Sequence, residues 1–357
     1  MRYKIKHLFL CLLVFLHCSS AHESLQVGAE RTAKYFPLLK DKAIGVVGNQ
    51  SSLIGTTHLV DSLLSAKLQV LKVFSPEHGF RGTADAGAHI ESGIDEQTGL
   101  PILSLYGSNK KPSSSQLEGI EILVFDIQDV GARFYTYIST LHYVMEAAAE
   151  NNIPLIVLDR PNPNGHYIDG PILDTAYRSF VGMHPIPIVH GMTIGEYAQM
   201  INGEKWLTDS VACELTVIPM LGYNKQMPYD LPVKPSPNLP NAQAVNLYPS
   251  LCLFEGTTIS VGRGTDLPFQ HYGAPFLESD YSFVPESGAG AKYPKHEGEK
   301  CYGQDLSQFT SLSQLDLSFI IDAYNECPEK EDFFNTFFDK LAGGNTLRLS
   351  IIDGKSE

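Results

Sequence analysis

The chain has 357 residues, of which 43% are hydrophobic and 18% charged, the composition of a folded globular protein. Its formal net charge of −14 argues against nucleic acid and anionic membrane surfaces as partners. The length allows two domains as readily as one.

The first 21 residues have the pattern of a secretory signal. A basic start precedes the apolar run LFLCLLVFL, which is too short to span a bilayer, and the small residues of HCSSA follow it. We therefore expect residues 1–21 to be a signal peptide cut after Ala21, and the protein to be exported to the periplasm or the extracellular space. Cys18 leaves a lipid anchor open as the alternative.

Strand and helix signals alternate through the first two-thirds of the chain. Near-continuous apolar runs predict strands at residues 43–49, 68–74, 121–127, 153–159 and 186–191. An apolar stripe at helical spacing over residues 134–150, and a T-x-x-E capping box at Thr193 and Glu196, predict helices. Such strands form a parallel sheet that is covered on both faces. The predicted fold class is α/β, with a Rossmann-like, mostly parallel sheet.

The last third of the chain breaks this rhythm. Residues 227–250 are rich in proline and asparagine, which predicts an ordered crossing between domains. A glycine-rich loop over residues 286–303 and an amphipathic helix near residues 331–342 follow. We expect a Rossmann-like domain over residues 22–245 and a smaller α+β domain over residues 246–357.

No cofactor or metal is predicted from the sequence. No strand is followed by GxGxxG, so a dinucleotide is not implied. The cysteines after the signal have no CxxC or zinc-type spacing, and their pairing stays open. They are Cys213, Cys252, Cys301 and Cys327.

Ionisable side chains collect in the loops that follow the predicted strands. Ligands of open parallel sheets bind outside the carboxyl ends of the strands, so these side chains are expected to converge. They are Glu77, His78, Arg81, Asp126, Asp129, Arg133, Asp159, Arg160 and His190. Glu77 stands out, because a position between Pro76 and a His-Gly pair serves helix capping poorly. For the others, caps and structural ion pairs stay open as alternatives.

The segment FEGTTISVGRGTD, residues 254–266, is the comparable stretch of the last third. Glu255 follows an apolar run, and Arg263 lies between two glycines. Two glutamates facing each other across a cleft would supply the acid and the base or nucleophile of glycoside hydrolysis. A strand-to-turn device is the alternative.

Six motifs occur in one order along the chain: SPEHGFRG, FDIQDVGARFYTYISTL, LDRPNPNG, HGMTIGEYA, PSPNLP and LFEGTTISVGRGTD. Together they resemble the NamZ-type exo-β-N-acetylmuramidase family, from about Ala43 to the C-terminus. The resemblance implies a glycosidase that releases terminal N-acetylmuramic acid from the non-reducing end of peptidoglycan fragments. It also implies an active-site cleft between the two domains and a further helical segment beyond residues 354–357.

This resemblance assigns candidate roles to residues of the motifs. Glu77 is the first catalytic candidate and Glu255 its partner, acting as a base, a nucleophile or a group that orients the substrate's acetamido oxygen. Arg133 and Arg263 are the candidates for the lactyl carboxylate, because an arginine binds a carboxylate through two hydrogen bonds. The candidate substrate-binding residues are His78, Arg81, Asp126, Asp129, Arg133, Tyr135, Asn162, His190 and Arg263.

Two other classes of protein remain as alternatives. A non-catalytic sugar-binding module would use the same acids and arginines only for hydrogen bonds to a muropeptide. A metal-dependent hydrolase is disfavoured, because the sequence has no HxH or HExxH spacing.

Overall fold

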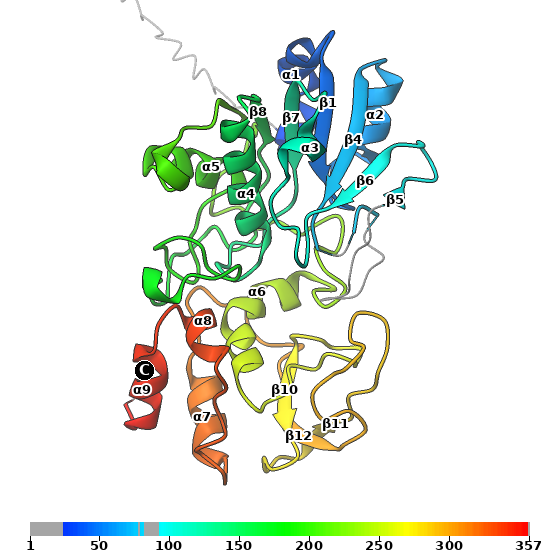
Figure 1. Ribbon diagram of the computed structural model, residues 1–357. Coiled ribbons are helices and arrows are strands. Elements are labelled where there is room, and N and C mark those ends of the chain that lie inside the picture. Colours follow the sequence, from blue (N-terminus) through cyan, green and yellow to red (C-terminus); the bar gives the residue numbers. More distant parts are fainter. Residues whose placement is uncertain (1–23, 78, 82–92, 356–357) are drawn as a thin grey trace, which may run out of the picture.

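The computed structural model describes residues 24–77, 79–81 and 93–355. The predicted signal peptide, with Cys18, and the candidate residue His78 lie outside the described residues. Figure 1 shows two parts, one above the other: a sheet with its helices, and below it α6 and all that follows in the chain. Within the described ranges, no helix is both long and apolar enough to cross a membrane.

A seven-stranded sheet forms the centre of the upper part. Its order is β5-β6-β4-β1-β7-β8-β9, and every pairing is parallel except that of the edge strand β5. The strands are β1 (Ala43–Gly48), β4 (Gln69–Ser75), β5 (Gly93–Ile94), β6 (Pro101–Ser104), β7 (Ile122–Asp126), β8 (Leu155–Leu158) and β9 (Leu215–Ile218). The chain runs outward from β1 to one edge and then returns through β7 to the other, which is the Rossmann arrangement. The predicted α/β class is confirmed.

One predicted strand is wrong. Residues 186–191 do not join the sheet; Val189 forms only isolated bridges, to Ala132 and Asp169. The outer position belongs to β9, whose sequence LTVI is only partly buried and gave a weaker apolar signal. The run at residues 186–191 is apolar because it packs inside the core as a loop.

Helices cover both faces of the sheet. On one face, Ile44 and Val46 pack with residues of α1 (Thr32–Leu39) and α2 (Leu59–Ser65). On the other, Val47 packs with residues of α4 (Tyr137–Glu150) and α5 (Ile194–Gly203), and Figure 1 shows α2 and α4 on opposite sides. Successive strand residues point to opposite faces, so burial of both faces requires the continuous apolar runs seen in the sequence.

Both helices expected in this part are confirmed. The stripe over residues 134–150 forms α4, and the capping box starts α5: Thr193 Oγ1 accepts a hydrogen bond from the Glu196 amide at 3.2 Å, and Glu196 Oε2 accepts one from the Thr193 amide at 2.9 Å. The short elements of this part are β2 (Leu53–Ile54), β3 (Thr57–His58), α3 (Ser114–Leu117) and the 3-10 helices η1 (Gly28–Glu30), η2 (Thr175–Tyr177) and η3 (Thr208–Ser210).

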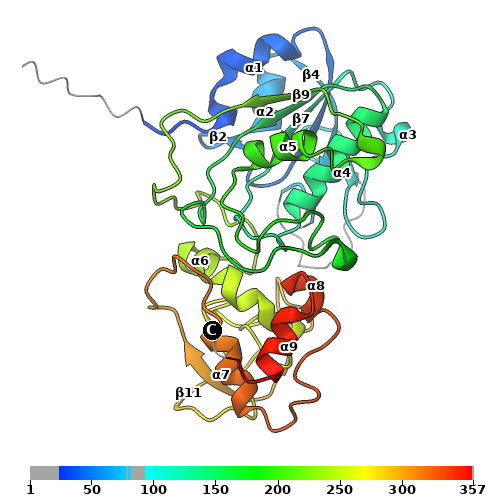
Figure 2. The ribbon, with the colours of Figure 1, turned by 90° about the vertical axis from the view of Figure 1, so that its left-hand side faces the viewer.

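The lower part combines helices with a three-stranded antiparallel sheet of order β10-β12-β11, so the expected α+β character is confirmed. Figure 2 shows α7, α8 and α9 beside one another, below α6. The elements are α6 (Ala242–Leu251), the 3-10 helix η4 (Cys252–Gly256), β10 (His271–Ala274), β11 (Tyr281–Phe283), β12 (Cys301–Asp305), α7 (Ser318–Glu326), α8 (Phe338–Ala342) and α9 (Thr346–Ile352).

The helix expected near residues 331–342 is only partly formed. Its second half is α8, whereas residues 331–337 are not helical. The Asn335 amide donates to the Gly256 carbonyl at 2.9 Å, and Phe333 and Phe334 pack against Tyr324. These contacts with other segments replace the helical hydrogen bonds.

One hydrophobic core runs through both parts. It includes Phe125 of β7 and Phe254 of η4. The predicted boundary at residue 245 falls inside α6, which Figure 1 shows at the junction of the two parts. The side chains at this junction are therefore packed against each other and do not flank a free linker.

Candidate active site

The carboxyl ends of β1 and β7 lie next to each other where the strand order reverses, and a buried ion pair occupies this position. Asp126 ends β7 and accepts hydrogen bonds from Arg160 Nε at 2.6 Å and Arg160 Nη2 at 2.9 Å. The side chains of Asp126 and Arg160 are 0% and 3% exposed. In this conformation Asp126 is one half of a buried ion pair, and its role in substrate binding stays a prediction.

Three of the predicted residues lie close together, but their contacts are with one another and with the turns around them: Asp129, Asn162 and His190. Asp129 Oδ2 accepts from the Gly131 amide at 2.8 Å and lies 3.4 Å from His190 Nε2. Gly131 has a φ of 81°, and a Cβ there would lie 2.2 Å from Asn162 Oδ1, so only glycine fits. Asn162 donates to the Met192 carbonyl at 2.8 Å. All three side chains are buried in these turns, so a substrate cannot reach them in this conformation.

Arg133 is fully buried and holds the two parts together. Its Nη1 donates to the carbonyls of Pro171 at 2.7 Å and Ile186 at 2.6 Å, and its Nη2 to that of Leu341, in α8, at 2.9 Å. Burial lowers the pKa of Arg133 to about 10. Nη1 and Nη2 are thus used by backbone carbonyls, whereas Nε is buried with no hydrogen-bond partner among the described residues, and the binding of the lactyl carboxylate by Arg133 stays a prediction.

Arg81 and Tyr135 also have protein partners. Arg81 contacts Asp95 through Nη2–Oδ2 at 2.8 Å and Nε–Oδ1 at 3.2 Å, and its guanidinium lies 4.7 Å from the Phe80 ring centre. The buried Tyr135 hydroxyl donates to the Pro235 carbonyl at 2.7 Å. In this conformation both side chains thus bind other groups of the protein.

Glu77 is half-buried, unlike the buried Asp126, Asp129 and Arg133. It follows β4, and its Oε2 accepts from Thr136 Oγ1 at 3.2 Å. Tyr106, after β6, also forms a side-chain hydrogen bond to Glu77. Burial first, and then the Glu77 carboxylate, raise the pKa of Tyr106, so its hydroxyl is a protonated donor at neutral pH.

Glu255 and Arg263 form the second half of the site. Glu255 Oε1 accepts from Arg263 Nε at 2.7 Å and lies 2.6 Å from Arg263 Nη2. Unlike the buried pair, these side chains are 24% and 27% exposed. They border a cavity of about 300 Å³ whose lining residues are Glu255, Ile259, Ser260, Val261, Arg263, Tyr293, Pro294, Lys295 and Phe337.

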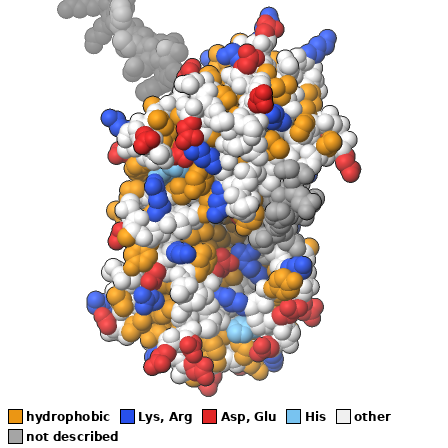
Figure 3. Space-filling view, viewed as in Figure 1, with side chains coloured by type: hydrophobic (Ala, Val, Ile, Leu, Met, Phe, Trp, Pro, Cys, Tyr) orange, Lys and Arg blue, Asp and Glu red, His pale blue; other side chains and the backbone are white. Residues whose placement is uncertain are grey.

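Charges of both parts act on Tyr106. Burial and then the Glu77 carboxylate raise its pKa, and the Arg263 guanidinium lowers it. Burial raises the pKa of Tyr248, and Cys252 and then Glu255 add to this effect; the Tyr248 ring centre lies 5.8 Å from that of Tyr135. Figure 3 shows a hollow in the middle of this face, between the upper and lower parts, with acidic and basic side chains beside it.

Tyr106, Tyr293 and Lys295 were not predicted. Tyr106 follows a strand of four residues that starts with proline, a weak strand signal. Tyr293 is 81% exposed at the edge of the cavity, and Lys295 donates to backbone carbonyls beneath Glu255. The last two belong to the glycine-rich loop, in which no pattern marked them.

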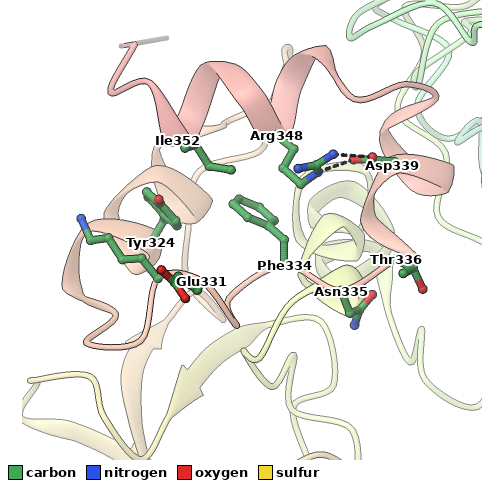
Figure 4. Close-up of a pocket in the computed structure, with 9 residues that line it drawn as sticks. Tyr324, Glu331, Phe334, Asn335, Thr336, Asp339, Arg348 and Ile352 are labelled. Carbon is green, nitrogen blue, oxygen red and sulfur yellow. Dashed lines mark hydrogen bonds and ion pairs between the residues drawn. The ribbon is translucent and has the colours of Figure 1, made fainter.

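A larger cavity, of about 410 Å³, lies among the C-terminal helices (Figure 4). There Arg348 Nε and Nη2 each donate a hydrogen bond of 2.8 Å to the carboxylate of Asp339, and Phe334 and Tyr324 line the same cavity. Neither candidate glutamate lines this cavity. Among the described residues, no group of three or more His, Cys, Asp or Glu is arranged to hold a metal ion, and the four cysteines are unpaired.

Fold and residue placement together define a Rossmann-like α/β protein with one candidate glutamate after strand β4 of the upper part and the other in η4 of the lower part. Residues 44–243 match the family model "Exo-beta-N-acetylmuramidase NamZ, N-terminal", and residues 246–357 match the corresponding C-terminal model. The chain belongs to this NamZ family.

Relatives and solved structures agree with this assignment. The chain is 43% identical over 353 residues to the peptidoglycan β-N-acetylmuramidase NamZ of Bacillus subtilis strain 168, covering 90% of this chain and 83% of the relative. A crystal structure of a DUF1343 family protein from Bacteroides fragilis is similar with a TM-score of 0.87 at 49% identity, over 93% of this chain and 92% of that one. A second such protein from the same organism has a TM-score of 0.78 at 30% identity, over 92% and 91%.

Proposed function

We propose that this protein is an exo-acting glycosidase that releases terminal β-linked N-acetylmuramic acid from the non-reducing end of peptidoglycan fragments. The observation that carries the proposal is the accessible Glu255–Arg263 pair at the border of a cavity of about 300 Å³, with Glu77 half-buried after β4 as the second candidate carboxylate. Glycoside hydrolysis requires two such carboxylates. Family membership and the Bacillus relative support the same reaction.

Glu77 is the proposed general acid. The hydroxyls of Thr136 and Tyr106 fix its carboxyl group, which orients the proton toward the leaving oxygen as the glycosidic bond breaks. Its loop follows β4 directly, so a rigid strand end positions it.

Glu255 is the proposed second carboxylate, acting on the sugar while Glu77 acts on the leaving group. Arg263 fixes Oε1, and Cys252 Sγ lies 3.6 Å from Oε2. A guanidinium has five N–H donors, more than one carboxylate oxygen uses, so Arg263 also serves as the proposed partner of the substrate's lactyl carboxylate. The anomer released first, observed by NMR, distinguishes inversion from retention and so assigns Glu255 as base or nucleophile.

Tyr293 is the proposed platform for a sugar ring. An aromatic side chain that is 81% exposed at the edge of the cavity offers an apolar face with a polar tip. The substrate lies in the cell envelope, and the basic start, apolar run and small residues at the N-terminus support export as part of the proposal.

The test compares an aryl β-N-acetylmuraminide, the corresponding N-acetylglucosaminide and the disaccharide MurNAc-GlcNAc as substrates. Wild type is expected to cleave only the muramic acid compounds. Glu77→Gln should lower kcat on the disaccharide by about 10²- to 10⁴-fold. The loss should be smaller on the aryl substrate, whose leaving group needs less protonation.

Glu118→Gln, at an exposed glutamate, is the matched control and should leave kcat unchanged. Full disaccharide cleavage by folded Glu77→Gln would remove Glu77 as the acid. Binding of the disaccharide by wild type without any cleavage would make the protein a sugar-binding module.

A further inference from the structure

We infer that Lys295 is a positioning residue for the reaction: its ammonium group holds the backbone on both sides of Glu255 and so sets the Glu255 carboxylate against Arg263. This inference rests on the proposed function, because it assigns a role within the same site.

The ammonium group of Lys295 lies among four backbone carbonyls. Nζ donates to the oxygens of Phe254 at 2.8 Å, Glu255 at 3.2 Å, Thr257 at 2.5 Å and Ile259 at 3.2 Å. The next residue extends the same contact: His296 Nε2 lies 2.7 Å from the Thr258 oxygen, where it must donate because a carbonyl only accepts. Two consecutive side chains thus hold carbonyls of residues 254–259.

The position of these carbonyls explains why a cation is needed. Two of the four carbonyls, those of Phe254 and Glu255, belong to the 3-10 helix η4 (Cys252–Gly256), whose last carbonyls have no partner within the helix; Thr257 and Ile259 lie beyond its end. These oxygens carry partial negative charge, which favours a lysine. Lys295 comes from a separate loop, so it fixes the end of η4 from outside.

Lys295 lines the same cavity as Glu255 and Arg263 but is not equipped to bind substrate. An ammonium group has three N–H donors, and four carbonyls already share them. Burial lowers its pKa to about 8, opposed by the attraction of Glu255. A cation desolvated beside a reactive carboxylate is typical of functional sites.

The test is a double-mutant cycle with Lys295→Met and Glu255→Gln, read as kcat and KM on the aryl muraminide. Misplacement of a catalytic group is expected to lower kcat of Lys295→Met by about 10- to 100-fold, with KM nearly unchanged. In the Glu255→Gln background the same change should cost less than about threefold, because residues that act through one another are not additive.

Chemical rescue separates positioning from general damage. Lys295→Cys should regain at least half of the lost kcat after reaction with 2-bromoethylamine, which restores an amine, but not with iodoacetamide. The cysteines of the described residues are buried, which favours reaction at the introduced thiol. Lys300→Met, at an exposed lysine of the same loop, is the matched control and should leave kcat unchanged.

The inference would be overturned if Lys295→Met lowered kcat by the same factor in the Glu255→Gln background as in wild type, at equal folded fraction. It would also be overturned if the amine failed to rescue Lys295→Cys. A rise in KM for the muraminide alone would instead make Lys295 a direct substrate contact. Wild type that cleaves neither sugar would refute the proposed function. In that case, hydrogen exchange of amides 254–263 still tests whether Lys295 holds this backbone segment in place. Unchanged exchange in Lys295→Met would refute that role.

Discussion

Two arginine–carboxylate pairs with equally short contacts have different surroundings in this molecule: Arg160 binds both oxygens of Asp126, whereas Arg263 contacts Oε1 of Glu255. Arg160 holds Asp126 with a shortest contact of 2.6 Å, and Arg263 holds Glu255 with the same shortest contact. The first pair is nearly inaccessible at the end of β7, whereas about a quarter of each side chain in the second is exposed at a cavity. Neither the residue types nor the shortest distance distinguishes a structural pair from a pair that a ligand can reach. Accessibility does.

The same contrast holds for the two parts of the molecule. The loops after the parallel strands supply most of the candidate polar groups, yet Asp129, Arg133 and His190 are buried and support the turns. The smaller lower part supplies the open pocket, through η4 and the glycine-rich loop. In this region the upper part contributes Glu77 and Tyr106 at its edge and otherwise acts as a rigid scaffold.

The largest effect is expected from Arg160→Met. It leaves Asp126 as a buried, unpaired charge, so the free energy of unfolding should fall by about 3–5 kcal/mol. Urea denaturation measures this, with kcat and KM taken on the folded fraction, where they should match wild type. A variant as stable as wild type would show that the buried pair is not structural.

Arg263→Met should lower activity but not stability, the opposite of Arg160→Met. Loss of the guanidinium that fixes Glu255 should lower kcat/KM on the muraminide by about 100-fold, equivalent to about 2.7 kcal/mol. The free energy of unfolding should change by no more than about 1 kcal/mol. Arg348→Met removes a pair of similar exposure with Asp339, outside the site, and should retain full activity. Equal losses in both variants would argue against a special role for Arg263.

A smaller effect, confined to KM, is expected at the edge of the open pocket. Tyr293→Ala removes the exposed ring and should raise KM for the disaccharide about tenfold, equivalent to about 1.4 kcal/mol, with kcat unchanged. Tyr293→Phe keeps the ring and should behave as wild type. A loss in Tyr293→Phe as large as that in Tyr293→Ala would assign the effect to the hydroxyl instead of the ring.

A pH-dependent loss of stability is expected in the buried scaffold. His184 Nε2 lies 3.0 Å from His142 Nδ1, and burial lowers the pKa of His142 to about 4 and that of His184 to about 2. The charged or titratable groups around them are Glu146, Arg178, Lys111 and Tyr197.

The unfolded chain therefore binds more protons than the folded one below the ordinary histidine pKa of about 6.5. Stability should fall as the pH drops from about 6.5 toward 4. The melting temperature between pH 7 and pH 5 measures this, and the double variant His142→Gln, His184→Gln should reduce the slope. An unchanged slope would assign the acid sensitivity to other groups.

The sequence predicted the fold class because burial on both faces imposes a pattern that a single strand already displays, as in residues 43–49 and 121–127. It was less accurate where tertiary contacts replace local preference. The apolar run at 186–191 is a buried loop, and residues 331–337 give up helical hydrogen bonds for contacts with Gly256 and Tyr324.

By itself the sequence determined the parallel sheet, the order of the polar loops and the two glutamates as candidates, since each depends on local pattern or on motifs in the chain. Only the tertiary structure decided which polar groups remain accessible. It buried Asp126, Asp129, Arg133, Asn162 and His190, left Glu77 and Glu255 half-buried, and brought Tyr106 and Lys295 to them. Accessibility and proximity depend on packing between segments far apart in the chain, and no local pattern records them.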